Sequence, residues 1–200
     1  MSTLLEITDN DIALLNDTNL RSLIGLLCEA DFRLAGLPTN GIIWGGHQNA
    51  SDGGEDVTIQ SEFDPPQSSN VPRKVTIFQV KKSDMPRSKI LGEMRPEGKL
   101  REEIKTLIQQ HGAYVIVSST EFTTNKAHKN RIEAMRDAVA DEPNHQQLYL
   151  DFWDQSRIVT WVRSHRSLIL WCEIKLADRY RDGNLTITGL IHQQGFKTST

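Results

Sequence analysis

The chain has 200 residues, of which 38% are hydrophobic and 24% charged, and its formal net charge at pH 7 is −3. This composition is typical of a globular protein and excludes a disordered chain. The longest strongly apolar stretch is far shorter than the roughly 20 residues that span a bilayer, and the first residues lack the basic and apolar regions of a signal peptide. The only two cysteines, Cys28 and Cys172, favour a reduced setting over a disulfide scaffold. We therefore expect a soluble, cytoplasmic protein with no membrane partner.

Hydrophobic periodicity predicts alternating helices and strands. A helix is expected from residue 16 or 17 to 36, because apolar residues recur there at spacings of three and four. A short strand is expected at 41–44, and two more at 57–60 and 74–82 flank a proline-rich loop. Strands that alternate with helices predict an α/β sandwich, with a mixed central sheet flanked by helices. The remaining expected elements are a helix at 98–110, a strand at 113–119, a helix at 126–140, a strand at 147–152 and helices ending at 162 and 177.

Charge is distributed unevenly along the chain. Residues 1–65 carry eleven acidic and two basic side chains, whereas residues 66–105 carry ten basic and five acidic ones. A basic segment can be an ordinary solvated surface, but it also supplies the phosphate contacts that nucleic-acid binding requires. Its position beside the candidate site described next favours phosphate contact.

Two short segments carry the candidate chemistry. The first, Asp52-Gly53-Gly54-Glu55-Asp56, is an acidic cluster on a glycine turn that opens the strand expected at 57–60. The second, Phe78-Gln79-Val80-Lys81-Lys82, closes the strand expected at 74–82. Because residues i and i+2 share a face of a strand, Gln79 and Lys81 point the same way.

The position of Asp56 relative to these two side chains depends on the register of the hairpin. If the strands pair about a turn centred near Ser68, Asp56 lies opposite Val80. A shift of one residue puts Asp56 on the face of Gln79 and Lys81. A carboxylate, an amide and a lysine would then meet at one end of the hairpin, and such a set can hold a divalent metal and assist attack on a phosphodiester.

Each residue type has a role in such a site. Asp56 would be the main charged ligand of Mg²⁺, with Mn²⁺ as a substitute, and Gln79 would add a neutral side-chain oxygen. The backbone carbonyl of Val80 is a further candidate ligand. Lys81 would orient or deprotonate water, or stabilise charge on the phosphorus. Lys82 points to the other strand face and is expected to contact phosphate or solvent.

The order Gly-Gly-x-Asp, followed by a strand ending in Gln-x-Lys, resembles the Mrr-like branch of the PD-(D/E)xK nucleases, a superfamily that includes restriction endonucleases and Holliday-junction resolvases. The resemblance covers about residues 20–163 and implies a restriction endonuclease-like α/β sandwich. It also implies that Asp56 and Gln79 bind Mg²⁺ and that Lys81 serves the attacking water. Most of the superfamily has an acidic residue where the Mrr-like branch and this chain have glutamine.

The resemblance further implies a glutamate ligand from the first helix, and two carboxylates are candidates. Glu29 is the helix glutamate, but it lies about 140° from the centre of the apolar stripe. Asp31 lies about 60° from that centre, on the face expected to be buried. Glu29 is the candidate that family habit favours and Asp31 the one that helical geometry favours, so the choice stays open.

The organisation expected is one Mrr-like domain over residues 1–200, with a core at about 17–163 and a C-terminal helix and linker at 164–200. Two segments of the N-terminal half carry a further likeness: Leu26-Leu27-Cys28-Glu29-Ala30 and Trp44-Gly45-Gly46-His47-Gln48-Asn49. With them, this half is similar to the effector domains that lead bacterial antiviral proteins with a STAND-type ATPase and a sensor region. This likeness implies a partner region on the C-terminal side and a homo-oligomer.

The function expected is a Mg²⁺-dependent endonuclease that cleaves double-stranded DNA in antiphage defence or restriction. One site cuts one strand, so duplex cleavage would need two protomers. The alternative is a catalytically inactive nuclease-fold module that binds nucleic acid or a protein partner, which the neutral Gln79 and the acidic net charge favour. An RNA nuclease would use the same residues.

Overall fold

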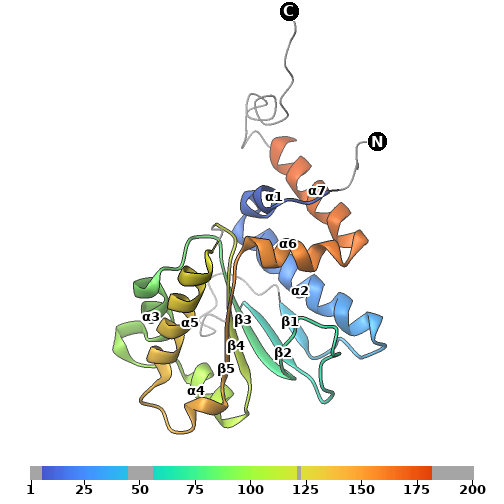
Figure 1. The fold of residues 1–200 in the computed structure, drawn as a ribbon. Coiled ribbons are helices and arrows are strands. Elements are labelled where there is room, and N and C mark those ends of the chain that lie inside the picture. The colour runs from blue at the N-terminus through green and yellow to red at the C-terminus, as the bar shows by residue number, and fades with distance from the viewer. Residues whose placement is uncertain (1–5, 45–55, 121–122, 182–200) are drawn as a thin grey trace, which may run out of the picture.

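The computed structural model describes residues 6–44, 56–120 and 123–181. One five-stranded mixed sheet lies between two layers of helices, which confirms the predicted α/β sandwich (Figure 1). The first three strands pair antiparallel and the last three pair parallel. The strands lie in chain order: β1 (Ile42–Trp44), β2 (Val57–Gln60), β3 (Val75–Lys81), β4 (Ala113–Ser118) and β5 (Tyr149–Trp153).

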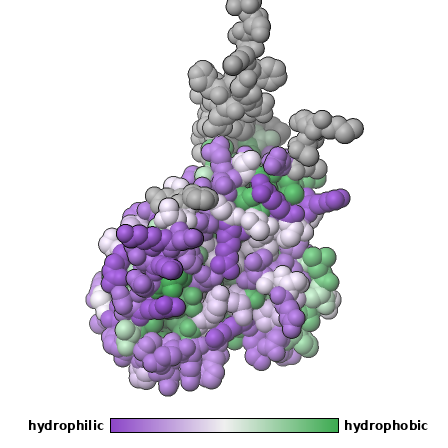
Figure 2. Space-filling view, viewed as in Figure 1, coloured by the Kyte–Doolittle hydropathy of each residue, from purple (hydrophilic) through white to green (hydrophobic). Residues whose placement is uncertain are grey.

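Each face of the sheet has its own hydrophobic core. The first core is formed with α1 (Asp9–Leu14), α2 (Asp17–Leu34), α6 (Gln155–Arg163) and α7 (Arg166–Arg181). The second is formed with α3 (Arg87–Met94), α4 (Glu102–Gln109) and α5 (Asn125–Val139). Two short 3-10 helices, η1 (Pro96–Gly98) and η2 (His145–Gln147), complete the second layer. The face of the molecule seen in Figure 2 is largely hydrophilic, and its apolar patches are small and separate.

The register of the β2–β3 hairpin decides which side chains meet at its end. Val57 pairs with Phe78, and one step further along the same ladder Asp56 lies opposite Gln79. This is the shift of one residue that the convergence of the site requires. Its physical reason is burial: Val57 and Phe78 both face the first core, so Asp56 and Gln79, each one residue away, turn from it.

The long helix α2 begins and ends at residues with specific capping roles. The side chain of Asn16 accepts a hydrogen bond from the backbone N–H of Asn19, as an N-cap residue does. After the helix, Gly36 adopts φ = +68°, a conformation that glycine tolerates best. Within the helix, Gly25 packs against the ring of Trp44 so closely that a Cβ would lie 2.2 Å from its Cγ. The absence of a side chain at Gly25 therefore lets β1 approach α2.

Two helices were not expected from the sequence, α1 and α3. The predicted helix at 98–110 begins instead at Glu102, after the separate turn η1. Core residues also lie beyond the expected limits of 17–163, because Ile12 of α1 and Cys172 of α7 are fully buried. Among the described residues, no helix has both the length and the apolar character needed to cross a membrane.

Candidate functional site

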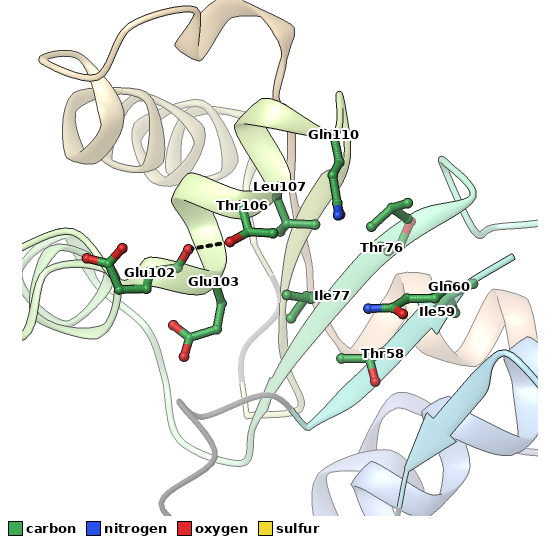
Figure 3. A pocket seen from close by; sticks show the side chains of 11 residues that line it. Thr58, Ile59, Gln60, Thr76, Ile77, Glu102, Glu103, Thr106, Leu107 and Gln110 are labelled. Atoms are coloured by element: carbon green, nitrogen blue, oxygen red, sulfur yellow. Dashed lines mark hydrogen bonds between the residues drawn. The ribbon is translucent and has the colours of Figure 1, made fainter.

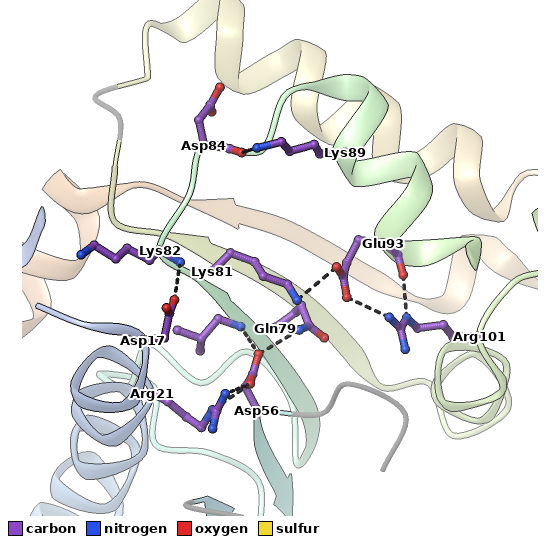
Figure 4. Close-up of polar contacts among 11 residues, drawn as sticks. Asp17, Arg21, Asp56, Gln79, Lys81, Lys82, Asp84, Lys89, Glu93 and Arg101 are labelled. Carbon is purple, nitrogen blue, oxygen red and sulfur yellow. Dashed lines mark hydrogen bonds and ion pairs between the residues drawn. The ribbon is translucent and has the colours of Figure 1, made fainter. Parts of the chain in front are cut away.

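Asp56 lies at the centre of the polar contacts at the end of the hairpin (Figure 4). Its Oδ2 accepts hydrogen bonds from Nε2 of Gln79 and from the backbone N–H of Val80, both at 2.8 Å. Its Oδ1 accepts from Nε of Arg21 at 2.7 Å, and a terminal nitrogen of the same guanidinium lies at 2.7 Å. Both carboxylate oxygens are therefore engaged, one by β3 and the other by α2.

The environment of Asp56 changes its acidity. Burial raises the pKa of the carboxyl above its ordinary value of 3.8, because the charged form loses solvation. The hydrogen bond from Val80 N–H and the charges of Arg21 and Lys81 act in the opposite direction, but the effect of burial on the pKa is larger. The carboxylate is therefore less stable in its charged form than an exposed one, which is typical of a functional group.

The side chain of Lys81 is bound by α3, whereas Asp56 is bound by α2. Its Nζ lies 3.1 Å from Oε2 of Glu93, a residue of α3. Oε1 of the same carboxylate lies 2.9 Å from a terminal nitrogen of Arg101, whose Nε also donates to the backbone carbonyl of Glu93. The side chains of Lys81 and Glu93 are only partly exposed. Glu93 thus fixes the ammonium of Lys81 near the Asp56–Gln79 pair.

The sheet end is also tied to the start of α2. The backbone N–H of Lys82 donates to Oδ1 of Asp17, at 3.2 Å. Arg21 lies one helical turn further along the same helix. The first turns of α2 are therefore attached to the end of the β2–β3 hairpin at two successive points, Lys82 just after β3 and Asp56 just before β2.

Three of the residues expected at the site are brought together: Asp56, Gln79 and Lys81. Val80 takes part through its N–H, which donates to Asp56, whereas its backbone carbonyl was the predicted metal ligand. Of the preceding acidic turn, residues 52–55 lie outside the described part of the chain. The structure thus places the three side chains at one sheet end.

Glu29 is not brought to Asp56. Its carboxylate accepts hydrogen bonds from Nε1 of Trp44 at 2.9 Å and from Arg33 at 2.5 Å. These contacts join α2 to β1, and the nearest helix residue that reaches Asp56 is Arg21, two turns away. In this structure Glu29 acts as a packing and hydrogen-bonding residue.

Asp31 is buried, as the helical period predicts, but in a separate network. Its Oδ1 lies 2.8 Å from Nε2 of His165. Its Oδ2 accepts from the hydroxyl of Ser69, the N–H of Asn70 and Nε1 of Trp161. This carboxylate therefore joins α2 to the loop before β3 and to the two C-terminal helices.

The fit of a divalent cation depends on two adjustments. Asp56 and Gln79 can supply the hard oxygen ligands that Mg²⁺ prefers, provided that the amide of Gln79 rotates to present its oxygen. Arg21 must also leave Oδ1, because its guanidinium stands where a cation would bind. Among the described residues no group of three or more His, Cys, Asp and Glu side chains has the spacing of a metal site. The donor set suits a cation that keeps several of its waters.

Two residues of the site, Arg21 and Glu93, were not predicted from the sequence. The sequence does contain a signal for Arg21, because it is one of only two Lys or Arg residues among the first 65. Glu93 carries none, because the helix that presents it was not expected.

Comparisons of the chain with protein-family models, with curated proteins and with solved structures find no match. The site is therefore interpreted from its own residues and geometry.

Proposed function

We propose that the chain is a Mg²⁺-dependent endonuclease that hydrolyses phosphodiester bonds of double-stranded DNA. The observation that carries this proposal is the meeting of Asp56, Gln79 and Lys81 at one end of the β2–β3 hairpin. A carboxylate, an amide oxygen and a lysine at one point suit the hydrolysis of a phosphate ester, because they provide metal ligands and a cation for developing charge.

Each residue of the site would have a separate role in hydrolysis. Asp56 and Gln79 would hold Mg²⁺, which when bound would neutralise charge on the scissile phosphate. Lys81 would orient the attacking water and stabilise negative charge that develops on the phosphate oxygens. Glu93 would keep the ammonium of Lys81 directed at this point, because its carboxylate is fixed in turn by Arg101.

Basic side chains around the site support a nucleic-acid substrate. Lys82 follows Lys81 directly, and its side chain makes no ion pair within the described residues. Arg87 and Lys89 lie on the first turn of α3, close to the carboxyl end of β3 in sequence, and both are exposed. These charges would contact phosphates on either side of the bond that is cut.

A second function is favoured by a specific contact, the ion pair between Arg21 and Asp56. A carboxylate neutralised by an arginine needs no metal, so the same fold could bind nucleic acid or a protein partner without catalysis. In that case DNA binding would not require Mg²⁺ and would survive the substitution Asp56→Ala.

The test is cleavage of plasmid DNA in the presence of Mg²⁺, by the chain alone and by the chain joined into dimers. Lys81→Ala and Asp56→Ala are expected to abolish cleavage while the far-ultraviolet circular dichroism spectrum stays unchanged. Lys82→Ala is the matched control, and it is expected to weaken DNA binding but to leave cleavage of bound DNA. Cleavage only by the dimer would support activation by assembly, which a C-terminal ATPase and sensor region could drive in antiphage defence or restriction.

Cleavage that persists in Lys81→Ala would contradict the role of this lysine. Metal-independent DNA binding without any cleavage would favour the second function. A parallel assay with an RNA of the same sequence separates a DNA nuclease from an RNA nuclease.

A further inference from the structure

A cavity of about 200 Å³ lies between α4 and the β2–β3 hairpin (Figure 3). Apolar side chains line part of it, among them Ile77 of β3 and Leu107 of α4. Ligand pockets for drug-sized molecules measure roughly 300–1,000 Å³, so this cavity suits one small group.

Polar groups without partners surround the apolar part. Thr58 and Gln60 come from the strand side, and Glu103 and Gln110 come from the helix side (Figure 3). Within the described part of the chain, none of these four side chains makes a hydrogen bond or an ion pair. Two amides, a hydroxyl and a carboxylate are thus free to bind a ligand that presents both donors and acceptors.

The cavity adjoins the Asp56 site on the same face of the hairpin. Thr58 pairs with Ile77, and two residues along each strand Asp56 lies opposite Gln79. Two residues of a strand span about 7 Å, because each residue rises about 3.4 Å. A nucleotide whose phosphate lies at Asp56 could therefore place its own or a neighbouring base in the cavity.

A buried hydroxyl without a partner lies on the strand next to β3. Tyr114 of β4 pairs with Ile77, is 2% exposed and has no hydrogen-bond partner for its hydroxyl among the described residues. Burial raises the pKa of this phenol most. The charge of Glu93 raises this pKa further, that of Arg101 lowers it, and those of Asp56 and Glu103 raise it less. A buried hydroxyl without a partner is unusual and is normally satisfied by water or a ligand.

We propose that this cavity binds a single nucleobase, unstacked from the DNA strand, that carries an exocyclic amino group. The inference rests on the proposed function, since it assigns the substrate of the same site. The carboxylate of Glu103 would accept hydrogen bonds from the amino group of the base, as acidic side chains do at cytosine. The amides of Gln60 and Gln110 would bind the remaining donors and acceptors of the base edge.

The charge of the cavity favours a base over a phosphate. The carboxylate of Glu103 faces the cavity, whereas that of Glu102 points away from the strands and is paired with Lys105 (Figure 3). A phosphate would be repelled by Glu103. A neutral base edge meets no such repulsion. Thymine and uracil, which lack an amino group, would gain least from Glu103, so the cavity discriminates between bases.

A binding measurement tests the inference without requiring cleavage. The probe is a single-stranded oligonucleotide with one 2-aminopurine, whose fluorescence rises when the base leaves the stack, and the buffer contains EDTA. The intact chain is expected to raise the fluorescence in a saturable manner. Glu103→Gln is expected to weaken this response about tenfold, as loss of a hydrogen bond to a charged group does. Thr106→Trp, which fills the cavity from an exposed helix position, is expected to abolish it.

The control is Glu97→Gln, which removes the same charge from an exposed residue of η1 outside the cavity. Fluorescence anisotropy of an end-labelled oligonucleotide measures total DNA binding in the same samples. Bound DNA with no rise in 2-aminopurine fluorescence would overturn the inference, as would an equal rise in all variants. A rise that disappears in Glu103→Gln but is never followed by cleavage with Mg²⁺ would retain the base site and refute the nuclease. Cleavage with Mg²⁺ but without any rise in 2-aminopurine fluorescence would refute the base site and retain the nuclease.

Discussion

The guanidinium of Arg21 lies against the carboxylate of Asp56, with two of its nitrogens 2.7 Å from Oδ1. The pair joins α2 to the end of the β2–β3 hairpin, and both side chains are largely shielded from solvent. An arginine bound to the main acidic residue of a candidate metal site would compete directly with a metal ion. The structure therefore describes a state in which Asp56 is already neutralised.

Replacement of Arg21 by glutamine is expected to strengthen cation binding. Without the guanidinium, Oδ1 of Asp56 becomes free, and the affinity for Mn²⁺ should rise about tenfold, the size of one charge-assisted hydrogen bond. The affinity is measured by titration with Mn²⁺, with free Mn²⁺ monitored by electron paramagnetic resonance. Arg33→Gln, on the same helix but paired with Glu29, is the control and should leave the affinity unchanged. Equal affinities in the intact chain and in Arg21→Gln would show that the pair does not compete with metal.

The raised pKa of Asp56 predicts a pH-dependent difference between the intact chain and Asp56→Asn. The folded pKa lies above the unfolded value of 3.8, so the contribution of this carboxyl to stability is present below 3.8 and is lost as pH rises through the folded pKa. The free energy of unfolding of Asp56→Asn, relative to the intact chain, should therefore increase from pH 3.5 to neutral pH. The attraction of Arg21 is already included in this folded pKa, because it acts on the charged carboxylate.

Urea unfolding at several pH values measures this difference. A relative stability that stays constant over the range would mean that burial does not raise the pKa. A decrease with rising pH would mean that the bonds from Arg21 and Val80 outweigh burial.

Asp31 and Glu29 are expected to differ in their contribution to stability. Asp31→Ala leaves the buried Trp161 and His165 and the partly buried Ser69 and Asn70 without their hydrogen-bond partner, which should cost about 3 kcal/mol or more. Glu29→Ala removes an ion pair with an exposed arginine and one bond to Trp44, which should cost about 1 kcal/mol. Chemical denaturation of both variants provides the comparison. A larger loss for Glu29→Ala would contradict the assignment of Asp31 as the structural carboxylate.

Two helical glycines are expected to respond to alanine with opposite signs. At Gly25 the new Cβ meets the ring of Trp44, and overpacking of about 1–3 kcal/mol should exceed the gain of about 1 kcal/mol in helix propensity. At Gly92 nothing lies within 4 Å of the new Cβ, so Gly92→Ala should stabilise the protein by about 0.5–1 kcal/mol. Thermal unfolding of the two variants tests the pair. Stabilisation by Gly25→Ala would mean that Trp44 moves away at little cost.

The sequence predicted most of the fold because its periodicity is local. The leucines of α2 and the continuous apolar run of β4 need no knowledge of distant residues to be recognised. α3 lacked such a signal: it is eight residues long, contains Gly92 and buries only Ile90 and Met94. As a result, Glu93 could not be placed beside Lys81.

The candidate site was predicted in part, for a related reason. Gln79 and Lys81 share a strand face by simple alternation, whereas the position of Asp56 depended on a register that loop length alone does not determine. Whether Glu29 or Asp31 joins the site depended on hydrogen-bond partners that are even more distant in sequence. Asp31 binds Trp161 and His165, which are 130 and 134 residues away, and no helical angle predicts such contacts.

The backbone N–H of Val80 donates to a carboxylate and to no neighbouring strand on that side, and this makes it a spectroscopic probe of the site. An amide proton bound to a charged oxygen is deshielded more strongly than one bound to a protonated carboxyl. Its NMR resonance therefore follows the ionisation of Asp56 and would shift again when a cation binds that carboxylate. The resonance of this one nucleus on the central strand would thus follow both the ionisation of Asp56 and the binding of a cation to it, in the intact protein and without a substrate.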